Sequence, residues 1–175
     1  MAENQDNLLL EIGTEELPVD YIAPALLQLR QWAETLVEPS AVKVWGTPRR
    51  LVLSVTSLKR FQKETVWGPP LVRARDEGGN WNKAAIGFSR SREKTGDDIL
   101  VGKKKGKEYL YLEMTVDRRE NLPAVLTELI SSLKFPKTMR WVTGSSFSFA
   151  RPIRWLVVLW GDTVVDLEIA GIRSD

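Results

Sequence analysis

Short segments in which apolar residues run together or alternate with polar ones predict β-strands along much of the chain. Residues 8–13 (LLLEIG) form an apolar run of strand length that stops at a glycine. Residues 50–58 alternate regularly, with Leu51, Leu53 and Val55 on one face of the expected strand. Three hairpins are expected to follow this first strand. They pair residues 42–45 with 50–58, 99–101 with 109–116, and 153–160 with 164–169.

Other segments have the spacing of amphipathic helices. Residues 19–36 place apolar side chains on one helical face, and so do residues 82–93. In the second of these segments Ala84, Ala85 and Phe88 should face inward. Both segments are therefore expected to pack one face against a sheet.

A third expected helix, over residues 121–133, has the clearest apolar stripe. Asn121 is a favourable N-cap residue, and Pro123 fits the first turn that follows it. Apolar residues then recur at i, i+3, i+4 and i+7 spacing, which is typical of a helix face packed on a core. The stripe comprises Leu122, Val125, Leu126, Leu129, Ile130 and Leu133.

The order of these elements indicates the fold class. Strands and helices are mixed without a strand–helix–strand rhythm, so we expect an α+β fold: a mixed, largely antiparallel sheet with about three helices. A chain of 175 residues is long enough for one ordinary domain or two small ones. Gly68, Pro69 and Pro70 interrupt regular structure and, with the turn at residues 76–80, suggest a sub-domain edge near residues 68–80.

The composition limits the kinds of catalytic and metal-binding site that the chain can form, because the chain contains neither cysteine nor histidine. Thiolate nucleophiles, Cys/His zinc sites and histidine general bases are therefore excluded. No glycine-rich phosphate loop occurs, and the adjacent Glu15 and Glu16 fit a helix start better than an acid–base pair. We expect no catalytic residue and no metal site in this chain. Without an apolar run of membrane-spanning length or a signal peptide, a cytoplasmic protein without a membrane partner is expected.

Basic residues are segregated along the chain although its formal net charge is only +2. Residues 41–63 and 133–161 contain bases but no acid, which predicts a basic face suited to a phosphate backbone. Tryptophans beside these arginines can stack on unpaired bases, or they can close the edge of a core. The arginines can equally be solvated strand-edge residues or brace acids such as Glu15 and Glu16. The lysine-rich residues 102–107 are interpreted as a solvated hairpin tip. The candidate RNA-binding residues are Arg49, Arg50, Lys137, Arg140, Trp141, Arg151 and Arg154.

Five motifs occur in order along nearly the whole chain. They are residues 8–18 (LLLEIGTEELP), 48–51 (PRRL), 83–90 (KAAIGFSR), 135–141 (FPKTMRW) and 149–155 (FARPIRW). With the ending GIRSD, they resemble the beginning of the beta subunit of bacterial glycyl-tRNA synthetase in order and spacing. The family's subunit is several times longer, so the resemblance implies that this chain is its N-terminal fragment.

The resemblance also implies a role. The family is a class II α2β2 ligase that attaches glycine to tRNA(Gly), using ATP and Mg²⁺ at the alpha subunit. The beta subunit supplies tRNA recognition and a scaffold, so this fragment is expected to hold no cofactor and to be inactive alone. An alternative is a purely structural module that docks the alpha subunit or the rest of beta without contacting RNA.

Overall fold

The computed structural model of the protein describes residues 5–175, which divide into two compact units. Unit 1 comprises residues 5–60 and 117–175, and unit 2 comprises residues 61–116. Residues 68–80, where the sequence suggests a sub-domain edge, lie within unit 2. Among the described helices, none combines the length and the apolar character needed to cross a bilayer.

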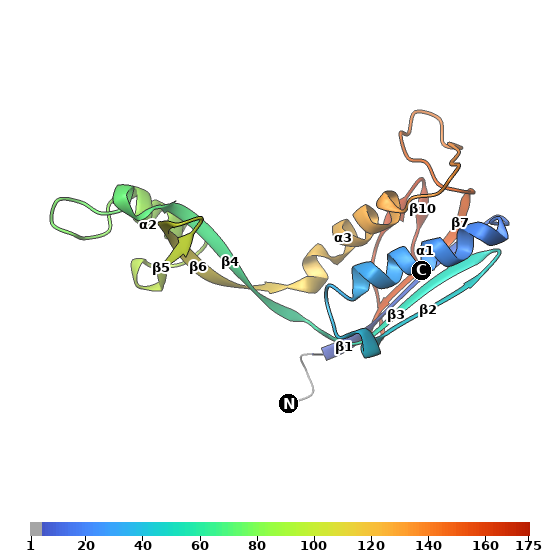
Figure 1. Ribbon diagram of the computed structural model, residues 1–175, viewed down its shortest axis with the longest axis horizontal. Helices are drawn as coiled ribbons and strands as arrows, with labels where there is room; N and C mark the ends of the chain where they lie inside the picture. The colour runs from blue at the N-terminus through green and yellow to red at the C-terminus, as the bar shows by residue number, and fades with distance from the viewer. Residues whose placement is uncertain (1–4) are drawn as a thin grey trace. The chain divides into compact units, whose positions relative to one another are not determined.

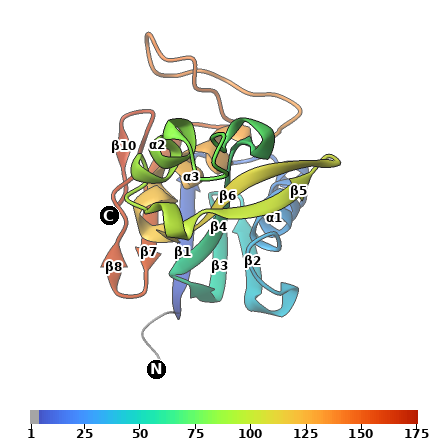
Figure 2. The same cartoon turned by 90° about the vertical axis from the view of Figure 1, so that its left-hand side faces the viewer.

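Unit 1 is built on a five-stranded sheet with the order β2-β3-β1-β7-β8 (Figures 1 and 2). The central strand β1 (Gln5–Thr14) pairs antiparallel with β3 (Arg50–Lys59) on one side and with β7 (Ile153–Trp160) on the other. The edge strands are β2 (Val42–Thr47) and β8 (Thr163–Val164). The antiparallel sheet and the three α-helices within residues 5–175 confirm the expected α+β class.

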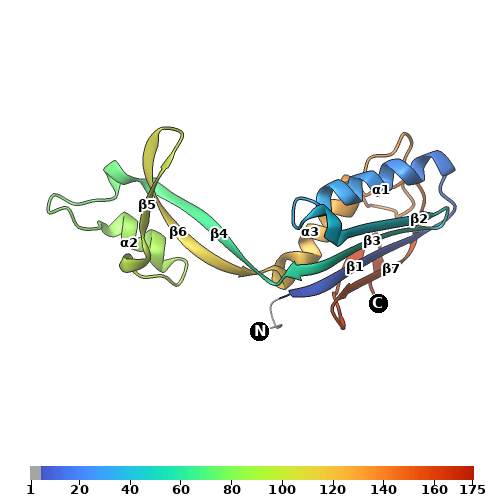
Figure 3. The ribbon, with the colours of Figure 1, turned by 60° about the horizontal axis from the view of Figure 1, so that its bottom comes forward.

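Two helices cover one face of this sheet (Figure 3). They are α1 (Val19–Ala33) and α3 (Arg118–Ser132), and between them and the strands lies the larger hydrophobic core. Leu53 of β3, Leu29 of α1 and Leu126 of α3 are fully buried in it. The alternation in β3 therefore places its apolar residues on the helix-covered face, as expected. A short 3-10 turn (Pro39–Ala41) follows α1, and the chain ends in a two-stranded sheet of β9 (Glu168–Ile169) and β10 (Ile172–Arg173).

Unit 2 has its own three-stranded sheet, with the order β4-β6-β5, and its own small core. The strands are β4 (Phe61–Pro70), β5 (Leu100–Lys104) and β6 (Lys107–Asp117). The helix α2 (Lys83–Arg90) packs its buried Ala85 against this core, and the side chain of Asn82 caps its first turn. Two 3-10 turns, Leu71–Arg73 and Gly96–Asp98, complete the unit.

Several expected helix details are wrong. Helix α3 begins at Arg118 rather than after Asn121, because Asp117 is its N-cap and accepts the backbone N–H of Arg119 at 3.0 Å. An acceptor one turn earlier therefore extends the helix beyond the start that the sequence suggested. Val125 of the predicted stripe is 37% exposed, and Ala84 of α2 is also exposed.

Two expected strands also differ from the structure. β4 continues through the predicted interruption to Pro70, because an edge strand does not need the N–H group that proline lacks. The single strand expected over residues 164–169 is divided, since β8 ends at Val164. Leu167 forms its hydrogen bonds with Ser174 instead of with β7. The backbone N–H of Leu167 donates to the hydroxyl of Ser174 at 2.9 Å, and the carbonyl of Leu167 accepts the backbone N–H of Ser174 at 2.8 Å.

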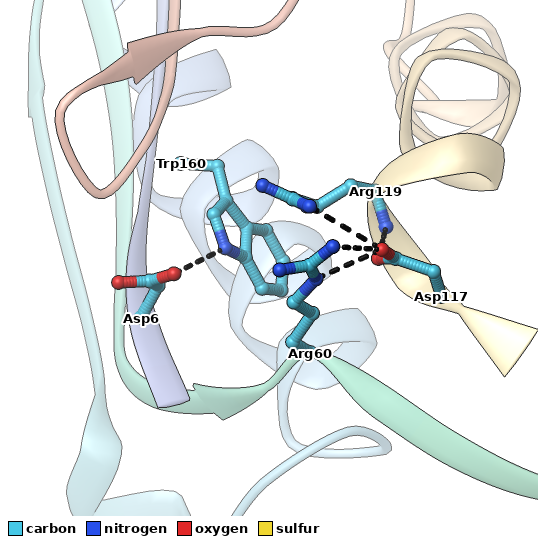
Figure 4. A network of polar contacts seen from close by, with 5 residues as sticks. All are labelled: Asp6, Arg60, Asp117, Arg119 and Trp160. Carbon is cyan, nitrogen blue, oxygen red and sulfur yellow. Dashed lines mark hydrogen bonds and ion pairs between the residues drawn. The ribbon is translucent and has the colours of Figure 1, made fainter. Parts of the chain in front are cut away.

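An arginine–aspartate network lies in unit 1 where the chain leaves for unit 2 and returns (Figure 4). Asp117 accepts a 2.8 Å hydrogen bond from Nε of Arg60, and Nη2 of Arg119 lies 3.4 Å from the same carboxylate oxygen. The hydrogen bond from Arg60 is the main reason that the pKa of Asp117 falls from 3.8 to about 2. Because the pKa is lowered in the folded protein, this carboxylate stabilises the fold above pH 4 and loses that effect between about pH 4 and 2.

Asp117→Asn is expected to lower the free energy of unfolding at pH 7 by about 1–2 kcal/mol, a value reduced for the partial exposure of the arginines. The difference from the unsubstituted protein should shrink as the pH falls from 5 towards 2. Urea unfolding at pH 7, 4 and 2.5 measures it, with the exposed Asp162→Asn as the control. A difference that stays constant with pH would contradict the charge-based account.

Candidate nucleic-acid interface

Three motif segments come together at one end of the unit 1 sheet. The end of β1 lies between the starts of β3 and β7, because both neighbours run antiparallel to it. The backbone N–H of Thr14 donates to the carbonyl of Arg49, and that of Glu15 donates to the carbonyl of Pro152, both at 3.0 Å. Segments more than 100 residues apart in sequence are thereby fixed side by side.

Arg50 and Trp155 share the sheet face that the helices leave uncovered. Both pair with Gly13 of β1, one from each side. The indole N–H of Trp155 donates to Oε1 of Glu11 at 2.7 Å, and Nε of Arg50 lies 3.2 Å from the same oxygen. The guanidinium carbon of Arg50 is 5.9 Å from the centre of the Trp155 ring. The Glu11 carboxylate therefore orients both the Arg50 guanidinium and the Trp155 ring on this face.

Arg151 and Arg154 lie beside the acidic turn that follows β1. Nε of Arg151 donates to the backbone carbonyl of Glu16 at 3.1 Å. Nη1 of Arg154 lies 3.9 Å from Oε1 of Glu15, in a pair whose two side chains are both more than half exposed. The expectation that part of the basic set braces these acids is confirmed for Arg154. An exposed pair of this kind adds little stability and leaves the guanidinium accessible.

The remaining candidates of the basic set lie in the long segment between α3 and β7. Lys137 and Arg140 are exposed on it. Two backbone hydrogen bonds between Met139 and Phe149, at 2.8 and 3.2 Å, join the two ends of the loop within this segment. Trp141 is half buried against the aromatic side chains of the same segment, so most of its ring packs on the edge of the core.

The basic set thus divides into paired and unpaired members. Within residues 5–175, no carboxylate lies within 4.0 Å of the charged groups of Arg49, Lys137 or Arg140. Arg50 and Arg154 have carboxylate partners, and Arg151 has a carbonyl partner. Residue patterns alone did not assign these partners.

Glu11 is the site residue that the sequence analysis missed. It is the one charged residue of the apolar run over residues 8–13, and alternation places it on the face opposite Leu10 and Ile12. That pattern could have marked it as a partner for Arg50. In the part of the chain that the structure describes, no three carboxylates are grouped so that they could hold a metal ion.

Exposed arginines and lysines beside an oriented tryptophan are typical of a binding or docking module. The family described as "Glycyl-tRNA synthetase beta subunit" matches residues 8–175 of the chain. The chain therefore belongs to this family. Four of the five resembling motifs lie in unit 1, and the fifth forms α2 of unit 2.

Individual relatives agree with this assignment. The glycine–tRNA ligase beta subunits of Oceanobacillus iheyensis and Desulforamulus reducens are 40% and 41% identical to the chain, each over 97% of its length. The beta subunit of Aquifex aeolicus is 37% identical over the same share. In each case the match covers 26% of the relative, so the chain spans about a quarter of the length of these relatives.

Proposed function

We propose that this chain supports the ATP-dependent attachment of glycine to tRNA as the N-terminal part of the non-catalytic beta subunit of a cytoplasmic glycine–tRNA ligase. In this proposal the partners are tRNA(Gly) and the alpha subunit, in a class II α2β2 enzyme whose ATP and Mg²⁺ are used in the alpha subunit. The chain alone is inactive, because its conspicuous side chains are suited to holding phosphates and bases rather than to moving protons.

The observation that carries the RNA-binding part is the set of cations at one end of the unit 1 sheet. Arg49 is exposed and has no ion-pair partner among the described residues, while Arg50 and Arg154 lie beside carboxylates. Cations that project from a rigid sheet end can follow a phosphate backbone, and release of counterions from the RNA then drives binding. Lys137 and Arg140 extend the same chemistry along the neighbouring segment.

Arg49→Glu, Lys137→Glu and Arg140→Glu are each expected to weaken binding of tRNA(Gly) by the assembled enzyme about tenfold at 50 mM salt. Each should also reduce the slope of log affinity against log salt by about one phosphate contact. Lys59→Glu is the matched control, because Lys59 is exposed at the opposite end of β3. Filter binding over a salt series measures both quantities, and glycyl-adenylate formation should remain unchanged in all variants.

A second candidate function is docking of the alpha subunit or the rest of beta, and the uncovered face of the unit 1 sheet favours it. Trp45 is 52% exposed and Val164 is 49% exposed on this face. Leu9 and Leu159 lie in one row with Val164 and are half buried. A contiguous apolar row on an uncovered sheet face is typical of a protein contact. If the three charge reversals leave both tRNA affinity and the salt slope unchanged in a folded protein, RNA binding by unit 1 is wrong and the docking function is favoured.

A further inference from the structure

The sheet of unit 2 also has one covered and one open face. Leu110 and Leu112 of β6 are fully buried in the core that contains Ala85 of α2. Strand alternation places Tyr109 and Tyr111 on the opposite face, where both are partly exposed. The open face therefore presents aromatic rings where an ordinary solvated face would present polar side chains.

Three rings form a cluster on this open face. Trp67 of β4 lies 5.3 Å from Tyr111 and 6.5 Å from Tyr109 between ring centres. Gly102 of β5 lies beneath them, since a Cβ there would be 3.0 Å from the ring of Tyr111 and 3.2 Å from that of Trp67. The missing side chain lets the rings lie close to the strand.

Lysines border the aromatic cluster on the same face. Lys104 and Lys107 are directly opposite one another across the β5–β6 hairpin, and alternation places them on the face of Gly102 and Tyr109. Nζ of Lys104 lies 5.3 Å from the centre of the Trp67 ring. Like charges directly opposite in a strand pair destabilise it, so this arrangement favours an anion that the protein itself does not supply.

The turn of the hairpin adds a third cation. Its two central residues, Lys105 and Gly106, have φ values of 50° and 76°, the left-handed conformation of a type I′ turn. Asparagine or glycine is usual at the first of these positions, and lysine there is strained. The loop that joins β5 and β6 extends beyond the rest of unit 2 (Figures 2 and 3). The four lysines of the hairpin end are exposed, as predicted for a solvated tip, and two of them in addition share a face with the rings.

We propose that the open face of unit 2 binds an unpaired segment of RNA. Bases would stack on the outer surfaces of Trp67, Tyr109 and Tyr111, and Lys104 and Lys107 would hold the adjoining phosphates. RNA fits better than an acidic peptide or an anionic lipid surface, because every base offers a π-face beside its phosphate. The inference rests on the proposed function only in taking tRNA as the natural ligand. The site uses no residue of unit 1.

The lysine arm of the test compares two faces of one hairpin. Lys104→Gln and Lys107→Gln in the 175-residue chain should each weaken binding of a fluorescein-labelled 12-nucleotide single-stranded RNA about fivefold at 50 mM salt, and lower the salt slope by about 0.7. Lys103→Gln is the control, because Lys103 lies opposite Glu108 in the strand register and both are on the other face of the hairpin. Fluorescence anisotropy gives the affinities. Equal effects of all three substitutions would show that binding depends only on the overall charge of the hairpin, and this result would overturn the proposal.

The aromatic arm separates ring stacking from charge. Tyr109→Leu and Tyr111→Leu should each weaken RNA binding at least about fivefold without changing the salt slope, whereas Tyr109→Phe and Tyr111→Phe should bind almost normally. A 12-base-pair RNA duplex should bind at least about tenfold more weakly than the single strand. If a leucine variant fails to fold, the lysine variants and the comparison with the duplex still decide the question. Equal binding of duplex and single strand, or no binding of the single strand, overturns the proposal.

The outcome can be distinguished from that of the proposed function. Arg49→Glu should reduce tRNA binding by the assembled enzyme but leave the affinity of the short single strand for the 175-residue chain within about twofold, because the oligonucleotide needs only the unit 2 face. If Arg49→Glu weakens binding of the oligonucleotide as much as Lys104→Gln does, the separate site on unit 2 is wrong. If Arg49→Glu changes neither, Arg49 is not an RNA contact and the unit 2 site stands.

Discussion

Leu126→Ala is expected to lower the free energy of unfolding of unit 1 by about 2–5 kcal/mol. Leu126 lies in the middle of α3, is fully buried, and belongs to the core between the helices and the five-stranded sheet. The substitution removes apolar contacts and leaves a cavity that a sheet braced on both sides of β1 can close only in part. Since small domains are stable by about 5–15 kcal/mol, this is a large share of the total.

The neighbouring residue provides a matched control. Val125 is on the same helix but is 37% exposed, so Val125→Ala should change the free energy of unfolding by less than about 1 kcal/mol. Urea unfolding followed by circular dichroism gives both values. A loss below about 0.5 kcal/mol for Leu126→Ala, or equal losses for the two substitutions, would show that this face of α3 is not packed as described.

Gly13→Ala is expected to destabilise unit 1 by about 2–3 kcal/mol. A Cβ at this position would lie 1.9 Å from the indole ring of Trp155, so the ring must leave its place on β1. The hydrogen bond from Trp155 to Glu11 would then break, and the carboxylate that orients Arg50 would lose a partner. The substitution therefore tests whether the Trp155 ring of the candidate interface lies where the structure places it.

A double-mutant cycle identifies the ring as the obstacle. In a Trp155→Leu background, Gly13→Ala should lower the free energy of unfolding by less than about 1 kcal/mol, because a leucine can turn away from the new methyl group. Thermal or urea unfolding of the four proteins gives the coupling energy. The same loss in both backgrounds would mean that the glycine is needed for another reason, such as its backbone conformation.

Local patterns predicted most elements of unit 1 but not their ends. Alternation located β3, and the apolar stripe located the buried side of α3, because both patterns repeat within a few residues of the chain. Asp117 displaced the predicted cap of α3, and Ser174 replaced β7 as the partner of Leu167, because these contacts compete with local preference. Pro69 and Pro70 remained in β4 since that strand lies at the edge of its sheet, a position that no local pattern encodes.

The family, the fold class and the existence of a segregated basic set follow from residue order, composition and short-range periodicity. Which cations lie together depends instead on how distant strands pair in three dimensions. Arg50, Gly13 and Trp155 form one row because β3 and β7 both pair with β1, although Arg50 and Trp155 are more than 100 residues apart in the sequence. The aromatic face of unit 2 likewise needed the register of β5 and β6 to bring Lys104 opposite Lys107. Strand register arises from the packing of the whole sheet, and a single-residue shift would move every side chain to the other face.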